Sequence, residues 1–241
     1  MLVSLIAVCA TVSAVSGQQT PAHKPSTAEL IAQLRSDNEQ ARSGAFESVR
    51  TNPAALRDPQ IKAALVNLLD RENHEPPSES GEDEGYAEYT SWLADTVAKV
   101  VDWSDPRQVC ILANSIDLSD ELANHAKVAV PCLLKRYNNS PARFRGNVVA
   151  MLVQAQAKGK SDLDAATVSE IHEITLSGLR DPDHGVKGET IRALGKFGGA
   201  DMIPALRASA DADASNDAGS RSIRRRTLQA IAEIEKRAGE N

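Results

Sequence analysis

Aromatic residues are scarce in this sequence. Its 241 residues include three Tyr, two Trp and three Phe, or 3% of the chain, while the hydrophobic share of 41% is mostly Ala, Leu, Val and Ile. Sandwiches and barrels are built from strands that favour aromatic and β-branched side chains. Small and aliphatic residues instead suit closely stacked helix pairs, so the composition predicts an all-α fold.

A basic excess is also lacking. The chain carries 27 Lys and Arg against 33 Asp and Glu, a formal net charge of −6, and its pI is near 5.4. Proteins that bind a nucleic-acid backbone usually show a strong positive balance. We therefore expect no nucleic-acid partner, and we interpret the acidity as an aid to solubility.

The longest apolar run lies at the start of the chain. Residues 2–15 are almost continuously apolar and uncharged, and Ser16 and Gly17 follow them. A run of about 14 residues is too short to span a membrane, which needs roughly 20. It is typical of a signal peptide, so we predict that residues 1–17 direct export to the periplasm or the medium. No Lys or Arg precedes the run, so either the true start lies upstream or the amino terminus alone supplies the charge.

Cysteine is rare as well. Cys9 lies in the predicted signal peptide, without the small residue directly before it that a lipid-anchored start needs. Two cysteines remain, Cys110 and Cys132, and both lie in apolar helical surroundings. In an oxidising compartment they could form one disulfide, and buried free thiols are an equal alternative. Their wide separation does not suggest a metal site.

Helix boundaries are clearest in the C-terminal half. Apolar residues at helical spacing occupy one face of residues 165–179, and a second apolar stripe follows in residues 186–194,. Between them, Asp181-Pro182-Asp183 ends one helix and starts the next. A helical hairpin of about 35 residues cannot bury its apolar faces alone, which predicts neighbouring hairpins.

Residues 179–206, LRDPDHGVKGETIRALGKFGGADMIPAL, resemble the HEAT repeat. In that family an Asp-Pro turn is followed by an aliphatic residue, a basic residue, and a small residue four positions after the aliphatic one. Val186, Lys187 and Thr190 stand in these places, where the family usually has Arg for Lys187 and Ala for Thr190. The resemblance implies an armadillo-like α-solenoid, a superhelix of antiparallel helix pairs, of an exported bacterial type.

The same pattern recurs along the chain. It fits Ile223-Arg224, Phe144-Arg145 and Ala41-Arg42, whereas residues 53–130 keep mainly the apolar spacing. We therefore predict an α-solenoid of about five to six antiparallel helix pairs across residues 27–238.

Three polar stretches lie outside these pairs. Residues 18–26 contain two prolines and read as a flexible lead-in,. Residues at about 73–85 are rich in Pro, Ser, Glu and Asp, and are predicted to form a disordered acidic loop,. Residues 208–220 are predicted to form a long loop before a basic final helix at 221–237.

The recurring Asp and basic positions have a structural use in this resemblance. In HEAT-like stacks, the turn Asp of one unit and the basic residue of the next helix can form a ladder of charge-assisted hydrogen bonds. We interpret the candidates as parts of the scaffold rather than as ligand contacts. They are Asp181, Lys187, Arg42, Arg145 and Arg224.

No catalytic constellation stands out in the sequence. One HEAT-like enzyme family, the deoxyhypusine hydroxylases, binds two irons through four spaced His-Glu pairs, but this chain has only His74-Glu75 and His172-Glu173. Neighbouring residues point about 100° apart on a helix, so one pair does not converge on a metal. Zincin, phosphate-loop and nucleophile-elbow motifs are absent from the sequence. We expect no catalytic residues, no cofactor and no metal site.

These features favour a non-enzymatic scaffold that binds a protein partner through exposed positions of the second helices, such as Glu47, Lys187, Arg192 and Arg225. An alternative is a HEAT-like lyase, or another enzyme accessory, that acts on a cofactor or chromophore. A structural role in an envelope complex differs from the first mainly in permanence. The acidic loop and the basic final helix could also pair with each other or with a second copy. We expect no membrane span.

Overall fold

The computed structural model describes residues 25–74, 84–115, 119–212 and 217–240. Within these ranges every regular element is helical and no strand occurs, so the predicted all-α class is confirmed. The predicted signal peptide and residues 18–24 of the lead-in lie outside the described residues. None of the described helices is long and apolar enough to cross a bilayer.

Twelve α-helices and three short 3₁₀ helices follow one another in the described part of the chain. The 3₁₀ helices are η1 (Ala55–Arg57), η2 (Lys160–Asp162) and η3 (Ala200–Met202). The α-helices are α1 (Thr27–Leu34), α2 (Glu39–Arg50), α3 (Pro59–His74), α4 (Glu84–Ala98), α5 (Pro106–Ala113), α6 (Ser119–Asn124), α7 (Ala126–Asn139), α8 (Ala142–Gly159), α9 (Ala165–Leu179), α10 (His184–Phe197), α11 (Ile203–Ala212) and α12 (Ala218–Glu240).

Local side chains set where these helices begin. Ser26 and Glu29 form a capping box at the start of α1, in which the Glu29 N–H donates to Ser26 Oγ at 3.3 Å. Asp183 caps α10 by accepting hydrogen bonds from the N–H groups of Gly185 and Val186,. The helix break predicted at the Asp-Pro turn is therefore present, although Pro182 lies before the N-cap rather than in the first turn.

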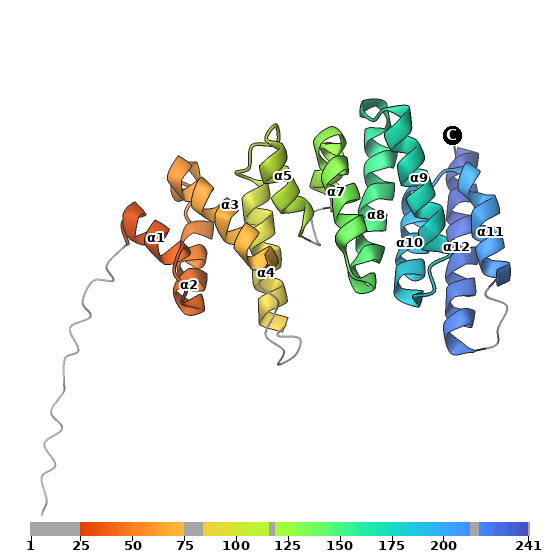
Figure 1. Cartoon of the computed structure of the whole chain (residues 1–241), viewed down its shortest axis with the longest axis horizontal. Helices are drawn as coiled ribbons and strands as arrows, with labels where there is room; N and C mark the ends of the chain where they lie inside the picture. Colours follow the sequence, from red (N-terminus) through yellow and green to blue (C-terminus); the bar gives the residue numbers. More distant parts are fainter. Residues whose placement is uncertain (1–24, 75–83, 116–118, 213–216, 241) are drawn as a thin grey trace, which may run out of the picture.

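The helices lie side by side in two layers along one row (Figure 1). In one layer, α3 contacts α1 and α5, and α5 contacts α7. In the other, α8 contacts α6 and α10, and α10 contacts α12. Helices adjacent in sequence, such as α7 and α8, also pack across the two layers. The described chain therefore starts at one end of the row and finishes at the other.

Helices α8, α10 and α12 repeat one packing register. A β-carbon added at Gly146 of α8 would lie 3.1 Å from the Cα of Val186 in α10. One added at Gly188 of α10 would lie 3.1 Å from the side chain of Arg226 in α12. The absence of a side chain at these two glycines lets neighbouring helices approach closely.

The residues three positions after Gly146, Gly188 and Arg225 differ in exposure along the row. Val149 of α8 and Ile191 of α10 are both 0% exposed, because the following helix covers them. Leu228 holds the same position in α12 and is 56% exposed, since no described helix covers it. The helix pairs thus bury their apolar faces against one another.

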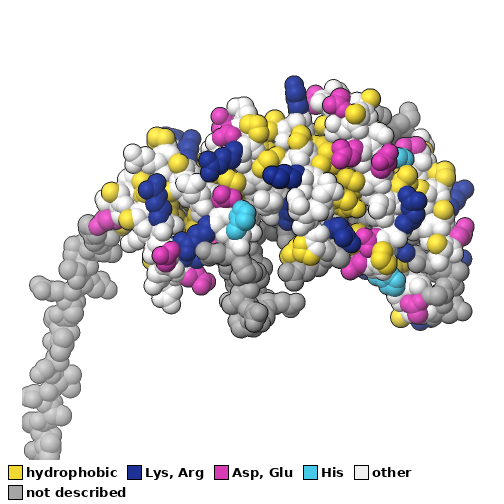
Figure 2. Space-filling view, viewed as in Figure 1, with side chains coloured by type: hydrophobic (Ala, Val, Ile, Leu, Met, Phe, Trp, Pro, Cys, Tyr) yellow, Lys and Arg dark blue, Asp and Glu magenta, His cyan; other side chains and the backbone are white. Residues whose placement is uncertain are grey.

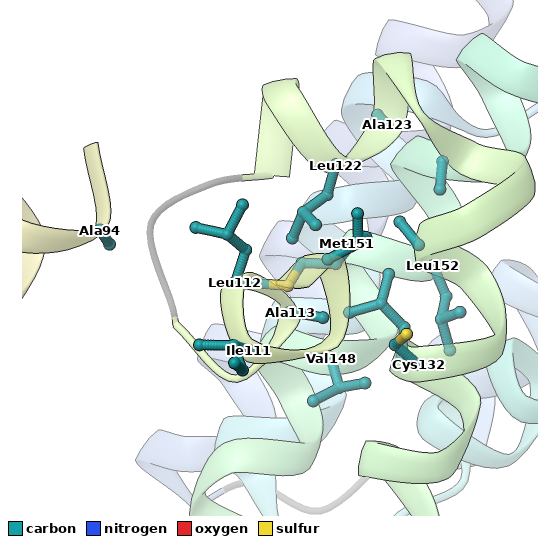
Figure 3. Packing of buried hydrophobic residues seen from close by; sticks show 14 of the residues in the cluster. Ala94, Ile111, Leu112, Ala113, Leu122, Ala123, Cys132, Val148, Met151 and Leu152 are labelled. Atoms are coloured by element: carbon teal, nitrogen blue, oxygen red, sulfur yellow. The ribbon is translucent and has the colours of Figure 1, made fainter. Parts of the chain in front are cut away.

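The middle of the row is held together by α5, α6, α7 and α8. Figure 3 shows Leu112 of α5, Leu122 of α6 and Met151 of α8 gathered in one apolar cluster, and each is at most 2% exposed. A disulfide joins Cys110 of α5 to Cys132 of α7, with their Cα atoms 5.0 Å apart. Short helix α5 is therefore attached both by packing and covalently.

Most of the predicted acidic loop, residues 75–83, lies outside the described residues, and α3 ends at His74. One segment is more helical than the sequence predicts. Helices α11 and α12 both extend into residues 208–220, where a long loop is predicted. Ser209 is buried there, and its hydroxyl donates a hydrogen bond to a carbonyl of α9 at 3.2 Å. This tertiary contact orders residues of α11 whose composition is typical of loops.

Candidate functional site

A groove of about 390 Å³ lies between α3 and α5. Its volume falls in the range of ligand-binding clefts, roughly 300–1,000 Å³. Val66 of α3 and Ile111 of α5 form a nearly buried apolar floor, with Val100 half-buried beside them. Polar side chains complete the lining: Lys62, Asn67, Asp102, Asp105, Arg107 and Gln108.

The residues of α3 that line the groove share one face of that helix. Lining residues that recur every three or four positions share a face. On α3 these are Pro59, Lys62, Ala63, Val66 and Asn67.

The opposite wall begins with a capped helix start. Asp105 is the N-cap of α5, and its Oδ1 accepts a hydrogen bond from the Arg107 N–H at 2.9 Å. Pro106 follows as the first helical residue, where a missing N–H costs nothing,. Asp105 and Pro106 therefore fix where α5 begins. This sets the places of Arg107 and Gln108 in the groove lining.

Hydrogen bonds hold the two carboxylates at this end of α5. Asp102 accepts from the Ser104 hydroxyl at 2.6 Å and from the Ser104 N–H at 2.9 Å, and these bonds lower the pKa of Asp102. Asp105 accepts from Gln108 Nε2 at 2.8 Å and from the Arg107 N–H, which lowers the pKa of Asp105. Both carboxylates are thus ionised at neutral pH and fix the shape of the loop.

Two cationic side chains line the same groove. Lys62 is half-buried on α3, and Arg107 is exposed on the first turn of α5. Neither forms an ion pair with another residue in the described ranges. Both can therefore donate to a carboxylate or a backbone carbonyl of a bound segment, and the amide of Asn67 can donate and accept.

Helix α5 is supported from the side away from α3. The Cys110–Cys132 disulfide ties it to α7. In the loop before α5, the Trp103 ring stacks on His125, with ring centroids 4.1 Å apart, and Trp103 Nε1 donates to the Ala98 carbonyl at 3.2 Å. An eight-residue helix is marginal by itself,. These contacts keep α5 in place as a wall of the groove.

Of the predicted ladder residues, Arg145 and Asp181 meet. Arg145 Nη2 on α8 lies 3.2 Å from Asp181 Oδ2 in the turn between α9 and α10. The other carboxylate oxygen of Asp181 accepts a hydrogen bond from the Asp183 N–H at 2.9 Å. The pair ties one helix pair to the turn of the next.

The other ladder candidates lie in different surroundings. Arg42 is buried in the first helix pair, where its Nε lies 3.1 Å from Glu72 Oε1 and its Nη1 donates to the Ser36 carbonyl. Lys187 is buried in the first turn of α10, whereas Arg224 is exposed on α12. A ladder that runs through all five residues stays a prediction.

Two half-buried arginines have structural roles that no sequence motif indicates. Arg136 of α7 donates to the carbonyls of Ala113 and Ser115 at the end of α5, and burial lowers the pKa of Arg136 to about 10. Arg237 of α12 donates to the Gly198 carbonyl after α10 at 2.9 Å. Each arginine satisfies carbonyls that the end of a helix leaves without intrahelical partners.

Within the described part of the chain, no group of three or more His, Cys, Asp or Glu side chains could hold a metal ion. Comparison with protein-family models found no match for this chain, and comparison with curated proteins found none either. The groove between α3 and α5 combines an apolar floor with a hydrogen-bonding rim.

Proposed function

We propose that this protein is a non-enzymatic scaffold of HEAT-like repeats that binds a protein partner outside the cytoplasm. The observation that carries the proposal is the groove between α3 and α5 within a two-layer row of helices. Stacked helix pairs offer extended surfaces whose side chains differ from unit to unit, and repeat proteins commonly bind partners in this way.

The groove suits an extended segment that carries an apolar side chain next to a carboxylate. The floor formed by Val66 and Ile111 would cover the apolar side chain. Lys62 and Arg107 would pair with the carboxylate, since neither forms an ion pair with another residue in the described ranges. An apolar centre with a polar rim is the usual layout of a protein interface.

Action outside the cytoplasm is supported by two separate features. A disulfide joins Cys110 and Cys132, and disulfides persist mainly in oxidising compartments such as the periplasm or the extracellular space. The apolar run at residues 2–15 is typical of a signal peptide,. In the cytosol the cysteine pair would be kept reduced.

A photo-crosslinking amino acid placed at Ala63 tests the groove. Ala63 is exposed and lines the groove, whereas Gln60 is exposed on the same helix outside the lining. Each labelled protein is illuminated with the periplasmic or secreted proteins of its source. We expect one reproducible protein adduct at Ala63 and none at Gln60. The Ala63 adduct should disappear when Lys62→Glu and Arg107→Glu are introduced together.

Circular dichroism must first show that all variants keep the helical content of the parent. With folding intact, the absence of any Ala63 adduct would contradict the proposal. Equal labelling at Ala63 and Gln60 would also contradict it, because it would show contact without selectivity for the groove.

A further inference from the structure

The last helix presents an exposed face where a further unit of the row would pack. In the register shared by α10 and α12, Arg225 occupies the place of Gly188, and Leu228 the place of Ile191. Gly188 and Ile191 are buried under α12, whereas Arg225 and Leu228 are exposed. We define the end face as the exposed residues of α12 at and beside these positions: Arg224, Arg225, Leu228 and Ala232.

Helix α12 is basic in an acidic protein. It contains six Lys and Arg against three Glu, a balance of +3, while the whole chain carries −6. On the side seen in Figure 2, by contrast, acidic and basic side chains are interspersed along the row. Glu235 of α12 pairs with Arg207 of α11 at 3.3 Å. Arg224 and Arg225 form no ion pair with any residue in the described ranges.

Arg225 makes the end face unsuited to another helix pair of the same kind. At this position α8 has Gly146 and α10 has Gly188, and an added β-carbon would lie 3.1 Å from the next helix at both. An Arg side chain does not fit that spacing, and burying its charge without a partner would be costly. The end face therefore fits an acidic partner.

The chain itself contains a complementary acidic segment. Residues 75–84, EPPSESGEDE, hold four Glu and one Asp and no Lys or Arg. Residues 75–83 lie outside the described residues, and their neighbours His74 and Glu84 are the last residue of α3 and the first of α4. Opposite charges of this density attract each other at the surface, most strongly at low salt.

The segment cannot reach the end face of its own chain. Residues 75–83 are nine in number and begin and end at α3 and α4, so at about 3.5 Å per residue they extend at most ~16 Å from these helices. Helices α7, α8 and α10 lie between α4 and α12 along the row (Figure 1). Packed helices lie about 8–10 Å apart, so the distance is on the order of 40 Å. The end face and the segment can meet only between two copies.

We propose that two copies of this chain pair in antiparallel orientation, each placing its residues 75–84 on the end face of the other. A two-fold axis between the rows lets the same contact form twice. The contact is electrostatic and exposed, so it weakens as salt rises. It involves no residue of the groove between α3 and α5, so it is independent of the proposed function.

Sedimentation of the full chain gives the first test. At about 10 mM salt we expect a concentration-dependent dimer, and at about 500 mM salt we expect the monomer, because the Debye length falls from roughly 30 Å to less than 10 Å. A chain that sediments as a monomer at low salt up to high concentration would overturn the proposal.

A charge swap identifies the two surfaces. The face variant carries Arg224→Glu and Arg225→Glu, and the segment variant carries Glu79→Lys, Glu82→Lys and Asp83→Lys, which changes the charge of residues 75–84 from −5 to +1. Each alone should weaken dimerisation by at least about tenfold, because attraction becomes repulsion. An equimolar mixture should recover the dimer, since both contacts between the two variants again join opposite charges. Failure of the mixture to recover would overturn the pairing of these two surfaces.

A matched control distinguishes the loss of this contact from a general effect of the change in net charge. Arg35→Glu with Arg57→Glu makes the same change in charge, at exposed positions near the opposite end of the row. We expect this control to dimerise like the parent. If it weakened the dimer as much as the face variant does, the effect would be one of overall charge and the proposed contact would be wrong.

Discussion

The Arg42–Glu72 pair shows how one long-range contact can carry much of the stability of a helix pair. Arg42 is 4% exposed and Glu72 is 6% exposed, and their side chains meet at 3.1 Å. Arg42 also donates to the carbonyls of Ser36 and Asp37 in the turn after α1. Removing one member of such a pair leaves the other charge in a buried site without its counter-ion.

We expect Arg42→Ala to lower the free energy of unfolding by about 3 kcal/mol or more. Urea denaturation followed by circular dichroism measures this loss. The double variant Arg42→Met/Glu72→Leu should lose much less, because it leaves no buried charge to solvate. A loss below about 1 kcal/mol in Arg42→Ala would show that the pair is more solvated than its burial indicates.

Two helical glycines offer a matched pair of substitutions. A β-carbon at Gly178 of α9 would lie 2.5 Å from the hydroxyl oxygen of Thr190 in α10, whereas one at Gly44 of α2 would meet nothing within 4 Å. Gly178→Ala should therefore destabilise the fold by about 1–3 kcal/mol through overpacking. Gly44→Ala should stabilise it by about 0.5–1 kcal/mol, because alanine loses less backbone entropy in a helix. Thermal melts that shifted in the same direction for both would contradict this contrast.

At the scale of one element, α5 is a short helix that depends on its attachments. It has eight residues, it contacts α3 on one side and α7 on the other, and it forms one wall of the groove. The disulfide from Cys110 to Cys132 spans 22 positions of sequence. Closing a loop of this size in the unfolded chain corresponds to about 3 kcal/mol of stabilisation.

Cys110→Ala/Cys132→Ala should consequently lower stability by about 3 kcal/mol. The same loss should appear in the parent protein after reduction by dithiothreitol, and dithiothreitol should have no effect on the double variant. Thermal unfolding of these samples checks the prediction. Equal melting temperatures of the oxidised and reduced parent would contradict it.

At the scale of the whole molecule, the value of a side chain depends on its place in the row. Ile191 and Leu228 hold the same register position, but Ile191 is 0% exposed inside the row and Leu228 is 56% exposed at its end. We expect Ile191→Ala to cost about 2–5 kcal/mol through the cavity it leaves. Leu228→Ala should change stability by less than about 0.5 kcal/mol. Urea denaturation at about 500 mM salt, where the proposed dimer is dissociated, measures both losses. Similar losses at both positions would contradict the prediction.

The sequence by itself determined those features whose causes are local. Aliphatic composition and helical spacing indicate an all-α chain, and the Asp-Pro turn at Asp181-Pro182-Asp183 marks a helix boundary, because capping and periodicity act within a few residues. Composition misled in residues 208–212, which belong to α11, where Ser209 packs against α9.

Tertiary structure alone decided which distant groups meet. Glu72 lies 30 positions from Arg42, and Asp181 lies 36 positions from Arg145, so neither partner can be read from local spacing. The groove likewise exists only because α3 and α5 pack side by side, and none of its lining residues is predicted as a site from the sequence. Local chemistry specifies the helices of this protein, whereas the packing of one helix pair on the next creates its long-range contacts and its groove.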